Sequence, residues 1–129
     1  TRVAAGVLSD DVIAGIEYAT QVVGTKVILV LGHESCGAVK AASKDVKLGS
    51  ITQLLEKIKP AVLQVKQEDP SIKHDSQEYV DLIAKHNAHN IADEIPERSP
   101  LIKKSLEEGK IKIVSGMYHT DSGEVEFLD

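Results

Sequence analysis

The chain has only one cysteine and no tryptophan, and both facts limit the kinds of fold and core that it can form. One cysteine cannot form an internal disulfide, and a free thiol suits a reducing compartment, so we expect a cytoplasmic protein. Aromatic residues make up only 3% of the sequence, which predicts an aliphatic core. No apolar run approaches the roughly 18 residues that a membrane helix needs. No charged segment followed by an apolar stretch opens the chain, so no secretory signal is predicted.

Arginine is also scarce, and acidic residues outnumber basic ones by 20 to 15. Arginine occurs only at Arg2 and Arg98, and the formal net charge is -5. A protein that binds nucleic acid usually carries a basic stripe or patch, so this composition argues against such a partner. The 129 residues are enough to bury a sizeable core, and no linker divides them. We therefore expect one domain that spans residues 1–129.

The order of the expected elements indicates an α/β domain with a mainly parallel sheet flanked by helices. The unbroken apolar run from Val27 to Leu31 is typical of a strand that is buried on both faces. Asp10 and Asp11 are expected to cap the first helix, and Ser50 a later one that Pro60 splits. The sequence predicts helices over 12–23, 36–43, 51–67, 76–95 and 100–108, strands over 26–32 and 110–118, and a C-terminal hairpin strand over 124–129.

His33 and Cys36 carry the chemistry that the sequence suggests. Both follow the first predicted strand, and in an open α/β sheet functional groups gather at the carboxyl ends of the strands. Imidazole nitrogen and thiolate sulfur are ligands that suit Zn²⁺. Two other interpretations stay open: Cys36 can be a small buried core residue, or a nucleophile that His33 activates. A structural zinc site needs four ligands, and the chain offers no second cysteine.

The segment GHESCGAVKAA, residues 32–42, resembles the zinc-binding motif of the β-class carbonic anhydrases. The resemblance covers most of the chain and is weakest over residues 45–89. It also includes the segments TRVAAGVLSDD (1–11), IEYATQVVGTKVILVLGH (16–33) and SPLIKKSLEEGKIKIVSGMYHTDSGEVEFL (99–128).

The resemblance implies a zinc enzyme that interconverts CO2 and bicarbonate and assembles as a homodimer or homotetramer. In the family two cysteines and one histidine hold Zn²⁺, and water or an aspartate takes the fourth position. By resemblance His33 is the nitrogen ligand and Cys36 the second sulfur ligand. Tyr18 and Ala4 match residues beside the substrate pocket, and Gly37 is expected there too.

The chain departs from the family pattern at two places. The family's other zinc cysteine belongs to a Cys-x-Asp-x-Arg motif upstream of the position of Arg2, and this sequence does not contain it. We expect that the native N-terminus lies further upstream and that a strand edge is exposed here. The alternative function is a metal-poor, non-catalytic domain that acts only through its oligomer interface. In addition, Ala5-Gly6 replaces the family's Gly-Asn, which places a β-carbon where glycine is usual.

The remaining histidines are weaker candidates. His86 and His89 are three residues apart on one predicted helix and could share a metal, although solvated surface positions are commoner. His74 and His119 are expected to face solvent. The side chain of Glu34 is expected to diverge from those of the two candidate ligands.

Overall fold

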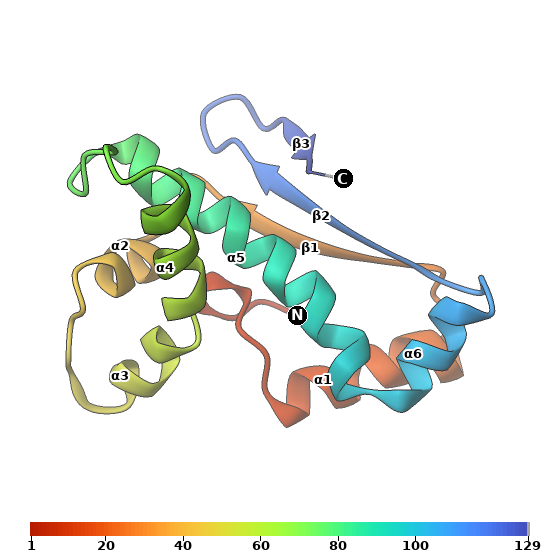
Figure 1. Ribbon diagram of the computed structural model, residues 1–129. Coiled ribbons are helices and arrows are strands. Elements are labelled where there is room, and N and C mark those ends of the chain that lie inside the picture. The colour runs from red at the N-terminus through yellow and green to blue at the C-terminus, as the bar shows by residue number, and fades with distance from the viewer. Residues whose placement is uncertain (129) are drawn as a thin grey trace.

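A computed structural model describes residues 1–128, so Asp129, the last residue of the predicted domain and hairpin strand, lies outside it. Strand β1 (Val27–His33) pairs in parallel with β2 (Lys112–Tyr118), and β2 pairs antiparallel with β3 (Val125–Phe127) (Figure 1). The parallel pair and the terminal hairpin confirm the predicted α/β class.

The helices follow in the predicted order. A proline at the start of α4 confirms the predicted break, and Ser76 and Ser99 cap the helices that follow them. The helical elements are η1 (Ala4–Gly6), α1 (Asp10–Glu17), the π-helix η2 (Tyr18–Val23), α2 (Gly37–Ser43), α3 (Gly49–Glu56), α4 (Lys59–Glu68), α5 (Gln77–Arg98) and α6 (Pro100–Glu107).

Two predicted helix caps are wrong. Ser9, not Asp10 or Asp11, caps α1, because its side chain accepts a hydrogen bond from the backbone N–H of Val12. The aspartates lie in the first turn, where negative charge stabilises the helix dipole. Ser50 lies inside α3, which begins one residue earlier and has no side-chain cap.

Helix α5 is the central element of the fold. It lies along one face of the sheet (Figure 1), with its apolar side chains divided between two buried clusters. The first cluster joins α5 to α2, α3 and α4, and the second joins it to α1, α6 and β1. One stripe of this helix, formed by Val80, Ile83, Asn87 and Ile91, is buried.

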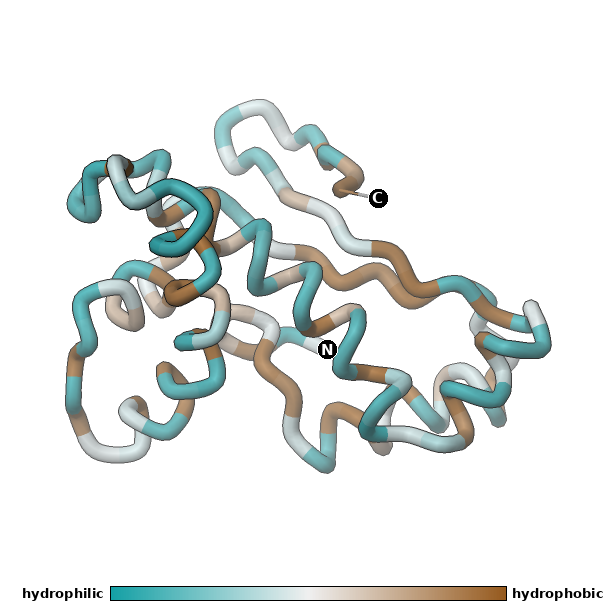
Figure 2. The backbone as a smooth tube through the Cα atoms, viewed as in Figure 1, coloured by the Kyte–Doolittle hydropathy of each residue, from teal (hydrophilic) through white to brown (hydrophobic). Residues whose placement is uncertain are grey.

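The expectation that β1 is buried on both faces is wrong. The side chains of Val27, Leu29 and Leu31 remain 53%, 43% and 43% exposed, although the strand is among the most apolar parts of the chain (Figure 2). Within residues 1–128, β1 is an edge strand and pairs only with β2, as the expected exposed edge requires. Its other side chains pack toward α5, and no described element covers the opposite face fully. A run of apolar residues cannot reveal whether both faces have a partner.

No helix in residues 1–128 has the length and the apolar character that a membrane span requires.

Candidate metal and substrate site

The candidate site begins where β1 ends. His33 is the last residue of this strand, and Cys36 immediately precedes α2 as its N-cap residue. Glu34 and Ser35 form the turn between them, and Ser35 adopts a left-handed conformation with φ of 55°. The strand and the helix thus fix the two ends of a short segment that carries both candidate ligands.

Among the described residues, one ring nitrogen of His33 takes part in a hydrogen bond. Its Nδ1 lies 2.8 Å from the carbonyl oxygen of Glu34. Because a carbonyl only accepts, this contact assigns the ring proton to Nδ1 and leaves a lone pair on Nε2. Metal-binding histidines are typically oriented by such a hydrogen bond from the other ring nitrogen. The environment of His33 therefore fits that of a metal ligand.

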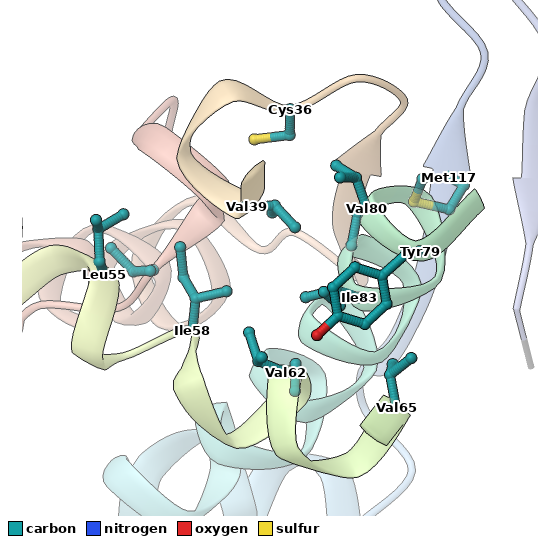
Figure 3. Packing of buried hydrophobic residues seen from close by; sticks show 13 residues of the cluster. Cys36, Val39, Leu55, Ile58, Val62, Val65, Tyr79, Val80, Ile83 and Met117 are labelled. Atoms are coloured by element: carbon teal, nitrogen blue, oxygen red, sulfur yellow. The ribbon is translucent and has the colours of Figure 1, made fainter. Parts of the chain in front are cut away.

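Cys36 is only 5% exposed and belongs to the first apolar cluster, above Val39 at the margin of that cluster in Figure 3. It also lines the same hollow as His33. Nitrogen and sulfur are a donor pair that suits zinc. Within residues 1–128 no group of three or more His, Cys, Asp or Glu side chains is placed to hold a metal. Among the described residues, His33 and Cys36 are therefore the candidate ligand pair, and no third such side chain joins them.

The hollow beside these two residues has a volume of about 1060 Å³ and runs along the free edge of β1. Ala4 and Gly37, both predicted at the substrate pocket, line it. Tyr18 is 61% exposed and lies outside the lining, whereas the following residue, Ala19, lies within it. The role of Tyr18 therefore stays a prediction. Most other lining residues are apolar, among them Val3, Val7, Ile16, Leu29, Leu31 and Ile91.

Ala5 and Gly6, which stand where the family has Gly-Asn, have an unusual backbone conformation. Ala5 has φ of 53° and Gly6 has φ of 65°, both in the left-handed region. Residues with a β-carbon disfavour this region, so the backbone of Ala5 is strained, whereas glycine adopts the same conformation without strain. The side-chain amide of Asn87 donates a 2.8 Å hydrogen bond to the carbonyl oxygen of Ala5. This contact ties the segment to α5.

A charged network adjoins the site on the side of the terminal hairpin. Glu34 is not among the residues that line the hollow, and its Oε1 lies 2.7 Å from Nδ1 of His119. The other ring nitrogen of His119 lies 3.5 Å from Glu126, which also pairs with Lys85 at 2.8 Å. The hydrogen bond to Glu34, together with both negative charges, raises the pKa of His119. The hydrogen bond from Lys85 and its positive charge lower the pKa of Glu126.

The expectation that His119 faces solvent is wrong, because the hairpin folds its ring against Glu34 and leaves it half-buried. The other histidines also have partners. His86 pairs with Glu68 at 2.9 Å, and His89 lies 3.7 Å from Asp93. His86 and His89 thus have different acidic partners and do not form a shared metal site among the described residues. The ring of His74 stacks on Tyr79, with 4.9 Å between centroids.

Two residues of α5 touch the site although sequence reasoning gave them no role there. Asn87 binds Ala5, and Asp81 accepts a 2.9 Å hydrogen bond from the backbone N–H of Ser35. Asn87 did leave a signal, because it is a polar residue in the apolar stripe of the helix. No comparable signal marks Asp81, since a half-buried acidic residue in a helix is common.

Comparisons with known proteins agree with the motif resemblance. The model of the carbonic anhydrase family matches residues 1–125. A carbonic anhydrase of Mycolicibacterium smegmatis is 32% identical over 97% of this chain and 60% of its own length. Carbonic anhydrase 2 of Mycobacterium tuberculosis is 30% identical over 99% of this chain and 61% of its own length. The chain thus spans about three fifths of the length of these curated relatives.

Solved structures show the same fold. The β-carbonic anhydrase CafA of Aspergillus fumigatus superposes with a TM-score of 0.86 at 25% identity, covering 100% of this chain and 62% of its own. A structure from a report on two tetrameric β-carbonic anhydrases of Sordaria macrospora gives a TM-score of 0.85 at 24% identity. That match covers 97% of this chain and 64% of the fungal chain.

Proposed function

The chain belongs to the β class of the carbonic anhydrase family, and on this premise we propose that it serves the zinc-dependent, reversible hydration of CO2 to bicarbonate. The observation that carries the proposal is the pairing of an oriented imidazole with a cysteine at the carboxyl end of β1. His33 and Cys36 line one hollow, and Nδ1 of His33 is engaged by the Glu34 carbonyl oxygen.

The two residues contribute in different ways. His33 would bind zinc through Nε2, because its Nδ1 proton is held by the carbonyl oxygen of Glu34. Cys36 would supply the sulfur from a buried position at the start of α2, where the helix N-terminus favours negative charge. A bound zinc ion would lower the pKa of a water ligand toward neutrality.

The wall of the hollow suits an uncharged substrate. CO2 has no net charge or dipole, so it is held by apolar contact and not by ion pairing. Ala4, Val39 and Gly37 lie on this wall with the two candidate ligands. The small side chains leave the space beside His33 open while they keep a largely apolar lining.

We further propose that the protein is a homodimer or homotetramer in the cytoplasm. The exposed apolar side chains of β1 support self-association, because burying such a surface is favourable in water. The fungal relatives described as tetrameric share the fold. The single free cysteine supports the reducing compartment.

The test is zinc binding and CO2 hydration by the purified protein and three variants. His33→Ala and Cys36→Ser are expected to weaken zinc affinity, in competition with a chromogenic chelator, by more than about tenfold. Both should also abolish zinc-dependent hydration in a stopped-flow assay. His86→Ala is the matched control, because this histidine pairs with Glu68 away from the hollow. His33 is exposed, so its removal should leave the fold intact.

Equal zinc affinity in the parent protein and in His33→Ala would contradict the proposal. Protein that assembles as an oligomer but binds no zinc and hydrates no CO2 would instead support the non-catalytic alternative. Rapid alkylation of Cys36 that added zinc does not slow would favour the nucleophile interpretation.

A further inference from the structure

Two residues beside the candidate site hold a backbone conformation that their side chains disfavour. Ser35, between the two candidate ligands, has φ of 55°, and Ala5, in η1 beside the hollow, has φ of 53°. For residues with a β-carbon, the left-handed region is narrow and energetically unfavourable. Such a conformation persists only where the surrounding structure holds it.

The same helix contacts both strained residues. On α5, Oδ1 of Asp81 accepts a 2.9 Å hydrogen bond from the backbone N–H of Ser35. Six residues later, Nδ2 of Asn87 donates a 2.8 Å hydrogen bond to the carbonyl oxygen of Ala5. Asn87 is only 5% exposed, so its amide is shielded from water. Without this partner, the buried amide would lack a hydrogen bond, which is energetically unfavourable.

The geometry of an α-helix explains how one element reaches two separate turns. With 3.6 residues per turn, the side chains of Asp81 and Asn87 lie about 60° to either side of that of Ala84. Ala84 is buried and lines the hollow, and its carbonyl oxygen faces Gly32 of β1. The two polar side chains therefore flank the line along which α5 packs against the strand that carries His33.

From this arrangement we propose that Asp81 and Asn87 are positioning residues, through which α5 sets the two halves of the site. Asp81 holds the Ser35 turn and thereby the mutual orientation of His33 and Cys36. Asn87 holds the Ala5 turn and thereby the wall of the hollow at η1. This assignment rests on the proposed function, since it gives each contact a role in metal or substrate binding.

Each contact has its own expected effect. Asp81→Ala removes the acceptor of the Ser35 N–H and should weaken zinc affinity by about tenfold to hundredfold, the range seen when groups that support a metal ligand are removed. Asp81→Asn retains an acceptor oxygen and should stay within about threefold of the parent protein. Asn87→Leu keeps the number and branching of the side-chain heavy atoms but lacks a donor. It should raise the KM for CO2 with little change in zinc affinity.

Glycine substitutions at the two strained residues separate positioning from general stabilisation. Ser35→Gly relaxes the turn that Asp81 holds, so it should restore zinc affinity to Asp81→Ala and leave Asn87→Leu unchanged. Ala5→Gly should restore the KM of Asn87→Leu and leave Asp81→Ala unchanged. Asn90→Ala is the control, because it removes another amide hydrogen bond of α5, the 2.8 Å bond to Gln64, away from both turns.

The experiment therefore measures zinc affinity by chelator competition, kcat and KM for CO2, and the backbone of both turns by NMR. Rescue that does not follow this pairing, or unchanged zinc affinity and KM in folded Asp81→Ala and Asn87→Leu, would overturn the proposal. The three-bond HN–Hα couplings of Ser35 and Ala5 and the exchange rate of the Ser35 amide do not depend on zinc. If the parent protein binds no zinc, the proposed function fails, and these couplings still decide whether α5 holds the turns.

Discussion

Gly32 and Met117 face each other across β1 and β2, and the thioether of Met117 occupies the space that a side chain at position 32 would need. A β-carbon on Gly32 would lie 2.8 Å from Met117 Sδ and 3.2 Å from the carbonyl oxygen of Ala84. Helix α5 can therefore approach β1 closely next to His33 only because residue 32 is glycine. The position of the candidate ligand depends on this contact.

Replacing Gly32 should disturb the packing beside His33 and destabilise the folded protein. Gly32→Ala is expected to lower the free energy of unfolding by about 1–3 kcal/mol, because buried Met117 and the α5 backbone must move. Urea unfolding measures this change. Gly15→Ala is the matched control, since a β-carbon there meets nothing within 4 Å. In the interior of α1 it should raise stability by roughly 0.5–1 kcal/mol. A stability of Gly32→Ala equal to that of the parent would contradict the close-contact argument.

The buried hydroxyl group of Tyr79 makes no hydrogen bond with the described residues. The side chain is fully buried, its oxygen points into the apolar cluster toward Val62 (Figure 3), and this oxygen has no hydrogen-bond partner among the described residues. Burial also raises the pKa of the phenol. Because an unsatisfied buried polar group costs about 1–3 kcal/mol, Tyr79→Phe should stabilise the protein by about 1 kcal/mol. Thermal and urea unfolding would show the gain.

The matched control for this change is Tyr118→Phe at the end of β2, where the side chain is partly exposed. It should alter stability by no more than about 0.5 kcal/mol. Destabilisation by Tyr79→Phe would mean that the hydroxyl has a partner in solution, such as an ordered water molecule.

The pair of His119 and Glu34 should make stability depend on pH. Since the folded state raises the pKa of His119 above 6.5, its stabilisation is complete below that value and is lost as the pH rises through the folded pKa. Glu126, with a pKa lowered from 4.5, adds stability above that value and loses it in more acidic solution. His119→Gln should therefore be less stable than the parent at about pH 5.5 and nearly equal at about pH 9.

Urea unfolding at the two pH values measures this difference, and an NMR titration of the His119 ring checks the direction of the pKa shift. His89→Gln is the control, because its contact with Asp93 is longer, at 3.7 Å, and lies on the surface of α5. An equal loss of stability for His119→Gln at both pH values would exclude the charged pair as its source.

The exposed side of β1 should mediate self-association. Leu29→Lys places a charge in the middle of this apolar strand, and burying it between subunits without a partner would be unfavourable. Sedimentation velocity should show a shift to smaller species. Leu63→Lys on α4, which is equally apolar and exposed, should leave the distribution unchanged. A shift in both variants or in neither would argue against β1 as the interface.

Local patterns predicted most elements because they report local physics. Gly24 in the left-handed conformation ends the first helical segment, Pro60 lies in the first turn of α4, and Ser99 caps α6. Each of these features follows from a property of the residue itself. The same reasoning placed His33 and Cys36 at a strand end, since a β-branched run followed by glycine marks one. It failed at Ser9 because two adjacent aspartates carry the same capping signal as the serine before them.

The sequence by itself determined the order of helices and strands, the aliphatic core and the family, because these depend on residue types and spacings along the chain. Only the tertiary structure decided which face of β1 stays exposed, that His119 meets Glu34, and that Asp81 and Asn87 hold the turns at Ser35 and Ala5. Those contacts join residues 46 to 85 positions apart. Their formation depends on where α5 and the hairpin pack against the sheet, and no local pattern encodes that placement.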